Sequence, residues 1–337
     1  MQKPGIFVVI MIFTTVVFHL SASSQNRGDS CRTAFNYNID EFAVSNTIKI
    51  CNNASQIPFG YEADINMPVC DDTLCANVVL KLYWDLAGNY KRFDTIPGNP
   101  LTKFDHKKFT SADYLKLDQI LKNRNSILRI VRKEELVDKT VKIKATTVDA
   151  VTGATPQTIK KAVVEGAVYS SFTLWHFING SIKNIMAGFT ESIYSEPIAR
   201  QILLSDNYET QLFALRKWSA TDYEVHSDLL FQVIRQSVPL VKSYAINKVP
   251  LPFELKEKNQ QFVALFPALD DYSKSIFLNR ITADKVLATV FLPLMISGSM
   301  DFNQKQQEQI AAAVQKFGIS GYKELPEKIQ KDDFGKD

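Results

Sequence analysis

The chain lacks an excess of charge of either sign, because 39 basic residues are balanced by 36 acidic ones, leaving a formal net charge of +3. Nucleic-acid-binding domains usually carry a strongly basic surface, so we expect no nucleic-acid partner. The G-x-S-x-G, H-E-x-x-H, Walker A and G-x-G-x-x-G patterns are also missing. We therefore predict no catalytic residue and no metal site. A hydrolase using Asp105 and His106 is a weaker alternative, since no third member of a triad can be identified.

Cysteine is scarce and confined to the first quarter of the chain, at Cys31, Cys51, Cys70 and Cys75. The C-x-x-C spacing of common zinc sites and the C-x-x-C-H signature of haem attachment are both absent, which leaves zinc only as a weak alternative. An even number of cysteines in an exported protein predicts two disulfides, although four cysteines allow three pairings. We favour Cys31–Cys51 and Cys70–Cys75, because each pair closes a local loop.

The N-terminus has the pattern of a secretory signal. Lys3 precedes a charge-free apolar run over residues 6–18, and the small residues at 21–24 suit cleavage. A membrane-spanning anchor, the alternative, needs about 20 apolar residues, and this run is shorter. We therefore predict a signal peptide over residues 1–24 and export of the mature chain.

The remaining length suggests about two domains. Residues 25–60 are polar and rich in Asn, and we expect an irregular segment tied down by the first disulfide. Residues 61–188 predict an α+β domain. Strand-forming runs at 61–69, 77–84 and 90–93 come first, then a helix opened by Thr110. Short strands at 127–131 and 140–143 follow, and a long helical pattern covers residues 157–179.

Strand patterns end near residue 190, and residues 189–320 predict an all-α domain. Capping-box spacing occurs at Asp206–Glu209 and at Thr221–Glu224. Further helices are expected over residues 254–266, 271–280, 283–296 and 303–317, with Gly318 ending the last. This cadence of paired short helices is similar to a HEAT-like solenoid, a plain helical bundle being the alternative. We expect residues 321–337, which are rich in charge, to form a flexible tail.

One short motif could carry chemistry. Asp149-Ala-Val-Thr152-Gly153-Ala154-Thr155 places a hydroxyl at the predicted start of a helix, directly before Pro156. A chance match to D-x-x-[ST]-G-A-[ST] is expected in about one chain in a thousand of this length. Unpaired N–H groups at a helix start favour a phosphate. The ordinary alternative is a Thr155 N-cap with proline at the first helical position.

This stretch resembles the flavinylation motif of FMN-binding domains, such as those in the Na⁺-translocating NADH:quinone reductase and the Rnf complex. The resemblance implies that Thr155 carries FMN through a phosphoester and that Asp149 is recognised by a flavin transferase. It assigns the tight turn of the motif to Thr152, Gly153 and Ala154. Where this family often continues with a small hydroxyl pair, the present chain has Pro156-Gln157-Thr158.

The resemblance implies an exported flavoprotein in a bacterial periplasm or cell envelope. Such a domain is a component of electron transfer, receiving or delivering electrons through a partner protein that can be membrane-bound, and the helical domain would serve for docking. The alternative is a non-catalytic interaction or scaffold protein whose α+β domain holds no flavin. Several aromatic side chains could reach an isoalloxazine ring, although core packing is their commoner role; they are Tyr83, Trp84, Tyr169, Trp175 and His176.

Overall fold

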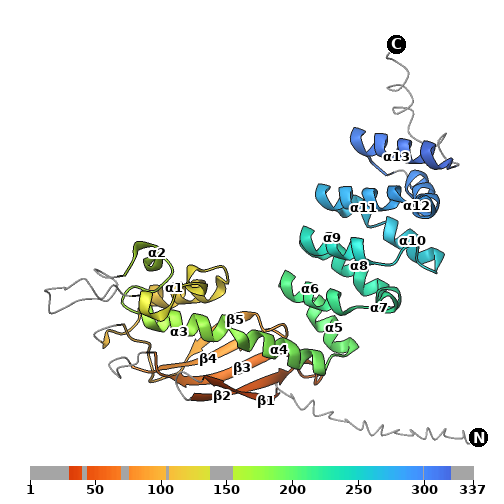
Figure 1. Cartoon of the computed structure of the whole chain (residues 1–337). Helices are drawn as coiled ribbons and strands as arrows, with labels where there is room; N and C mark the ends of the chain where they lie inside the picture. The colour runs from red at the N-terminus through yellow and green to blue at the C-terminus, as the bar shows by residue number, and fades with distance from the viewer. Residues whose placement is uncertain are drawn as a thin grey trace, which may run out of the picture.

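The structure is a computed structural model that describes residues 30–39, 44–69, 76–103, 106–136, 155–298 and 300–319. It has two parts (Figure 1), which we call the sheet module (residues 30–192) and the helical stack (residues 196–317). The prediction of an α+β domain followed by an all-α domain is confirmed. The predicted signal peptide over residues 1–24 and the tail over residues 321–337 lie outside the described residues.

The sheet module is built on five antiparallel strands, each paired with its neighbour in sequence. Side chains alternate between the two faces of such a sheet. On β3 and β4, Ile65 and Leu82 are buried on one face, while Asp64 and Lys81 lie on the other. The strands expected at 61–69, 77–84 and 90–93 are confirmed. The bounds are β1 (Ser30–Ile39), β2 (Val44–Asn52), β3 (Pro58–Met67), β4 (Val78–Trp84) and β5 (Tyr90–Thr95).

The expectation that residues 25–60 are irregular is wrong, because β1 and β2 lie within this range. β1 is an edge strand with largely exposed side chains, so it needs no alternating apolar pattern, and such a pattern is what sequence reasoning looks for. The Cys31–Cys51 disulfide is confirmed, and the two cysteines face each other in the register of β1 and β2. The predicted Cys70–Cys75 bridge lies outside the described residues.

Three helices cover one face of the sheet (Figure 1): α1 (Ser111–Lys122), α3 (Val168–Asn179) and α4 (Ser181–Ser192). α1 begins where predicted, directly after its N-cap Thr110, whose side chain forms a capping box with Asp113. The helices are fixed to the sheet by large side chains. The ring of Trp84 meets that of Phe177 edge to face, and the Tyr61 hydroxyl lies 2.6 Å from that of Thr190.

Two local predictions in this module are wrong. The strand expected at 127–131 is instead the 3₁₀ turn η3 (Ile127–Arg129), whose first turn is capped by the Ser126 hydroxyl. The long helix expected from residue 157 is broken into the one-turn helix α2 (Gln157–Lys160) and α3. Between them the chain turns at Gly166, which has a positive φ of 74° that glycine adopts without strain. The strand expected at 140–143 lies outside the described residues.

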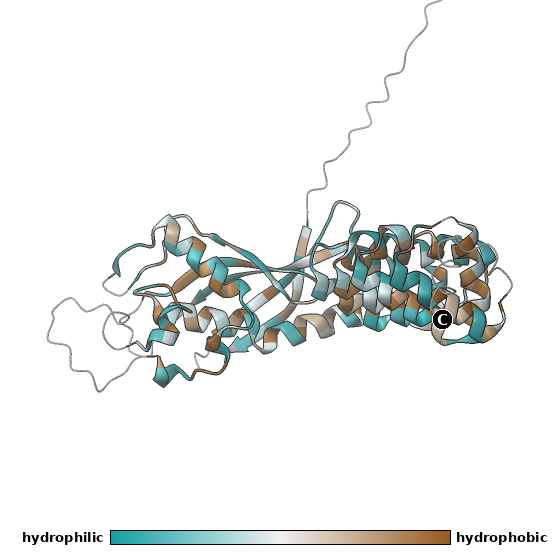
Figure 2. Cartoon of the chain, turned by 90° about the horizontal axis from the view of Figure 1, so that it is seen from above, coloured by the Kyte–Doolittle hydropathy of each residue, from teal (hydrophilic) through white to brown (hydrophobic). Residues whose placement is uncertain are grey.

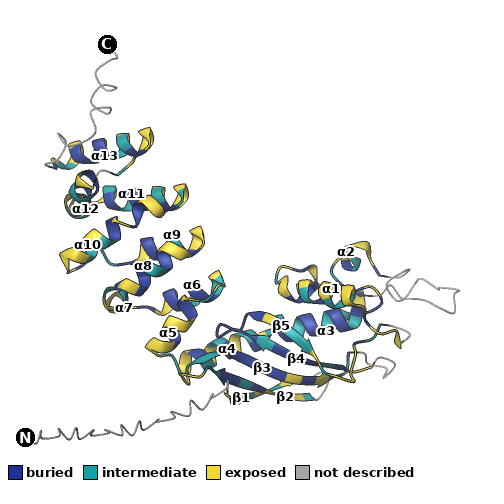
Figure 3. Ribbon diagram, turned by 180° about the vertical axis from the view of Figure 1, so that it is seen from behind, coloured by how far each residue is buried: buried dark blue, intermediate teal, exposed yellow. Residues whose placement is uncertain are grey.

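The helical stack has two layers. α6, α9, α11 and α13 contact one another in succession and form one layer, while α8, α10 and α12 form the other. Buried residues of these helices face the interior of the stack (Figure 3). The bounds are α5 (Glu196–Leu203), α6 (Tyr208–Lys217), α7 (Ala220–Val225), α8 (Ser227–Gln236), α9 (Pro239–Lys248), α10 (Lys256–Val263), α11 (Asp271–Ala283), α12 (Lys285–Ser297) and α13 (Gln304–Phe317).

Aromatic rings form the centre of the stack. Phe262 and Phe277 are both fully buried and stack with 4.7 Å between ring centroids. The predicted end of the last helix is confirmed, because Gly318 takes the left-handed conformation after α13. Seen from above, the sheet module and the stack lie along one line (Figure 2), and the side view shows the stack rising steeply from one end of the sheet module, so the molecule is bent (Figure 1). None of the described helices is long and apolar enough to span a bilayer.

Candidate functional site

The proposed attachment residue, Thr155, is the first described residue after a gap, and Asp149, Thr152, Gly153 and Ala154 lie outside the described residues. Only 4% of the surface of Thr155 is exposed. It does not cap a helix: Pro156 occupies the N-cap of α2, and Thr155 precedes it. Thr155 is therefore not followed by the long helix that was expected. A one-turn helix supplies little dipole potential to favour a phosphate at this position.

The segment that follows Thr155 is anchored to the helices over the sheet. Ile159 and Val163 are buried, and α2 lies against η3. The Lys116 amine of α1 donates a hydrogen bond to the carbonyl oxygen of Lys161 at 3.1 Å. The motif thus ends on a fixed part of the sheet module, on the side of the sheet that α1 and α3 cover (Figure 1).

The aromatic residues considered as flavin contacts have different surroundings. Trp84 and Trp175 are buried in the core, and the Trp175 indole donates to a backbone oxygen. Tyr83 lies on the opposite face of the sheet, where its hydroxyl donates to Asp94 at 2.8 Å. His176 contacts the turn that α2 also contacts: its Nε2 lies 2.9 Å from the carbonyl oxygen of Leu128 in η3.

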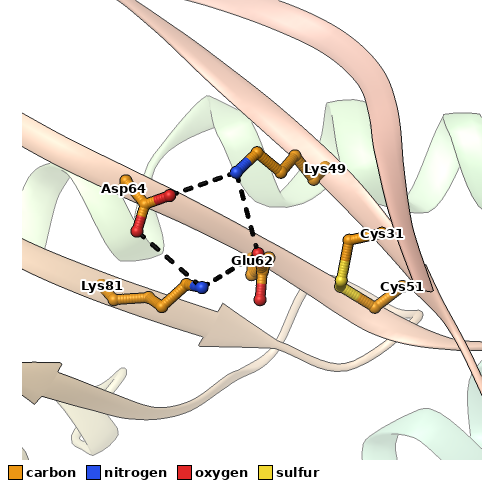
Figure 4. The surroundings of a disulfide bond; sticks show 6 residues. All are labelled: Cys31, Lys49, Cys51, Glu62, Asp64 and Lys81. Atoms are coloured by element: carbon orange, nitrogen blue, oxygen red, sulfur yellow. Dashed lines mark hydrogen bonds and ion pairs between the residues drawn. A yellow bond between two sulfur atoms is a disulfide. The ribbon is translucent and has the colours of Figure 1, made fainter. Parts of the chain in front are cut away.

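The helix-free face of the sheet carries paired charges beside the disulfide (Figure 4). The Lys49 amine lies 3.2 Å from Asp64 and 3.9 Å from Glu62, and the Lys81 amine lies 3.1 Å from Glu62. Within the described residues, the one group spaced like metal ligands is Glu62 with the two cysteines. Their sulfurs are bonded to each other, so no thiolate remains to bind a metal.

A polar cluster that the sequence analysis missed joins the sheet module to the stack. Asp85, in the turn after β4, accepts hydrogen bonds from the backbone N–H groups of Ala87 and Asn89, both at 2.9 Å. Its second oxygen accepts from the Asn89 amide and from the hydroxyl of Thr210 in α6. All these polar groups are buried and satisfied, which makes the joint specific as well as strong.

Three charged side chains surround this cluster. Glu209 of α6 is paired with Arg124, which follows α1, and lies 3.5 Å from the Lys183 amine of α4. The Lys183 amine also donates to Asn89 at 2.6 Å. Burial lowers the pKa of Lys183 to about 8, and the neighbouring positive charge of Arg124 adds to the shift.

The backbones are also in close contact at this joint. A Cβ atom placed on Gly88 would lie 2.6 Å from the carbonyl oxygen of Lys183, and Gly88 has a positive φ of 75°. Only glycine fits this turn without displacing α4. The sequence indicated a turn here, but nothing in it showed that the turn packs against helices about a hundred residues further on.

Comparison of the chain with protein-family models, curated proteins and solved structures finds no match.

Proposed function

We propose that the protein is an exported flavoprotein that carries FMN as a phosphoester on Thr155 and exchanges electrons with a partner protein in a bacterial cell envelope. The observation that carries the proposal is the motif from Asp149 to Thr155. A flavin transferase would attach the cofactor during maturation by moving the FMN group from a flavin dinucleotide to the Thr155 oxygen. The donor's pyrophosphate bond would break, and a nucleoside monophosphate and the hydroxyl proton would be released. The bound flavin would supply the redox chemistry, and the protein would supply its position and surroundings.

The fold is consistent with this role. The motif ends against the helical side of an antiparallel sheet, where buried side chains of α2 and α3 hold the chain in place. His176 lies on α3 beside η3, so a polarisable ring is present in this region of the module. The stack adds an extended two-layered surface, and stacked helices commonly serve for docking.

The burial of Thr155 sets a condition on attachment. Thr155 is only 4% exposed, so its hydroxyl cannot enter the active site of a transferase without movement of its surroundings. Attachment would therefore take place before the module has closed around Thr155, or during local opening of the folded protein. We expect a transferase to modify the chain much faster during synthesis and export than after folding.

The same burial favours the second candidate, a flavin-free scaffold. In that case Thr155 is a packing residue, and the sheet module serves only to hold the helical stack. The two candidates differ in one measurable property, the covalent flavin.

The deciding experiment is co-expression of the full chain with a flavin transferase, followed by intact mass spectrometry. The proposal expects a mass gain of one FMN less one water, which Thr155→Ser retains and Thr155→Ala abolishes. Thr158→Ala is the matched control, because this exposed threonine lies only three residues further along the chain. An unmodified wild-type chain, with the transferase active on another substrate, would establish the scaffold instead.

A further inference from the structure

A groove of about 860 Å³ lies between the edge of the sheet and the helix beside it. One wall is β5, the last strand of the sheet, and the other is α1, which contacts β5 (Figure 1). The turn after β5 adds Ile96, Pro97 and Pro100 to the lining. The whole groove therefore belongs to the sheet module.

The groove follows β5 along its open edge. Four consecutive residues of the strand, at positions 92–95, line it, although successive side chains of a strand point to opposite faces of the sheet. Phe93 packs against α1 on the helix-covered face. Asp94 lies on the opposite face, where it accepts a hydrogen bond from Tyr83. A cavity that touches side chains of both faces passes along the backbone between them.

The backbone at this edge is open. Within the described residues, positions 92–95 of β5 pair with β4 and form backbone hydrogen bonds with no other segment. Every second residue of an edge strand directs its N–H and C=O groups away from its neighbour strand. Such a row of groups is complementary to an extended polypeptide chain that continues the ladder.

The helical wall presents one side of α1 to the groove. Its lining residues are spaced by three or four positions and therefore share a face of the helix: Ser111, Tyr114, Leu115 and Asp118. Leu115 is 67% exposed. The Tyr114 hydroxyl is held by the backbone N–H of Leu101, which donates to it at 3.0 Å. The wall thus offers an accessible apolar side chain beside a fixed ring.

The charged groups of the lining are already paired. Arg92 forms an ion pair with Asp94. Asp118 is paired with Lys122 at 2.6 Å. These two positive and two negative charges sum to zero, and the other lining residues are uncharged. Charge complementarity therefore favours a ligand without charged side chains, since an added charge would find no free partner here.

We propose that this groove binds an extended, uncharged peptide segment of a partner protein, which adds to β5 as a sixth strand. Because side chains of a strand alternate, every second residue of the peptide would face α1 and could place an apolar side chain against Leu115. The proposal does not depend on the flavin, so it can hold or fail independently of covalent flavinylation.

The first step of the test selects a probe. A phage-displayed library of random heptapeptides is depleted on the Leu115→Lys variant, which places a charge in the groove, and is then panned on the full-length mature protein. We expect enriched peptides in which apolar residues alternate with uncharged polar ones. Enrichment of charged or non-alternating sequences, or no enrichment, overturns the proposal.

Fluorescence anisotropy with a labelled form of the enriched peptide then measures affinity. Leu115→Ala should weaken binding about five- to twentyfold through the lost apolar contact. Leu240→Ala is the matched control, because this leucine of α9 is 55% exposed and lies in the stack. It should leave the affinity unchanged, as should Thr155→Ala. Circular dichroism and melting curves establish that each variant is folded. Wild-type affinity in folded Leu115→Ala overturns the proposal.

The ladder is tested on the peptide itself. Two further forms carry N-methyl groups, one on the odd positions and one on the even positions. Only alternate N–H groups of an added strand face β5, so one form should lose affinity by at least about tenfold while the other keeps it. Amide hydrogen exchange should show new protection in β5 and none in β1, the opposite edge of the sheet. Equal affinities of the two N-methylated forms, or protection of β1 in place of β5, overturn the proposal.

Discussion

The sheet module and the helical stack are stabilised in different ways. In the sheet module, hydrogen bonds join residues that are far apart in sequence. The hydroxyls of Tyr61 in β3 and Thr190 in α4 are hydrogen-bonded, and the Trp175 indole in α3 donates to the carbonyl oxygen of Asn123. In the stack, each helix contacts mainly its neighbours in the two layers. The sheet module should therefore unfold as one unit, whereas the stack can lose structure locally, as repeat proteins do.

The two parts also differ in chemical content. The flavinylation-like motif and the disulfide both belong to the sheet module. The stack contributes its surface and one wall of a cleft at the joint between the two parts. Under the proposed function, the sheet module would hold the cofactor and the stack would present it to partners. The buried cluster around Asp85 joins the two parts.

The largest expected effect comes from Phe262→Ala in the centre of the stack. Removing a fully buried ring should lower the stability of the stack by about 3–5 kcal/mol, through lost transfer free energy and the remaining cavity. Amide hydrogen exchange should accelerate in α8, α10, α11 and α12, whose rings or helices surround it. Equal acceleration in β3 and β4 would show that the sheet module and the stack unfold together.

The next largest effect is expected from removal of the Cys31–Cys51 disulfide, which closes a loop of about 20 residues. Replacing both cysteines by serine should lower the stability of the sheet module by about 3 kcal/mol, mainly because the unfolded chain gains freedom. Trp84 and Trp175 report on this module, and Trp218→Phe removes the tryptophan signal of the stack. Denaturant unfolding followed by fluorescence in this background measures the loss. An unchanged midpoint would mean that packing alone holds β1 in place.

Features that depend on local signals could be predicted from the sequence. Helices in the stack are set by local signals, and Asn303 and Gly318 mark the two ends of α13 as predicted. Where several neighbouring polar residues could cap the same helix, the sequence does not show which of them does. The cap of α6 is Asn207 and not Asp206, and Thr221 lies inside α7, which is capped by Ser219, because nearby polar side chains can satisfy the same N–H groups.

Features that depend on distant contacts could not be predicted. β1 is held in the sheet by pairing with β2 and by packing of Phe35 against α4 and of Tyr37 against α3. The polar sequence of β1 does not reveal these contacts. The break at Gly166 interrupts a pattern that is helical in its local preferences. Likewise, Asp85 and Thr210 meet only in the folded protein, so the cleft at the joint has no signature in the sequence.

The smallest expected effect concerns the joint itself and depends on pH. Burial lowers the pKa of Lys183 to about 8, whereas an unfolded lysine titrates near about 10.4. Between these values the unfolded chain binds more protons than the folded one, so this residue makes stability rise with pH. Below about pH 8 the buried charge of Lys183 lowers the free energy of unfolding by its full amount, and above about pH 10.4 this destabilisation is gone.

Lys183→Gln isolates this contribution, because glutamine can still donate to Asn89 but carries no charge. Urea unfolding of both proteins at pH values from about 7 to 9.5 gives the difference between wild type and variant. Tyr61, whose pKa burial raises to about 12, is common to both proteins and cancels. We expect wild type to gain stability relative to the variant as the pH rises. Parallel curves would mean that Lys183 is solvated at the joint, and the sheet module and the stack would then be joined less tightly than the structure indicates.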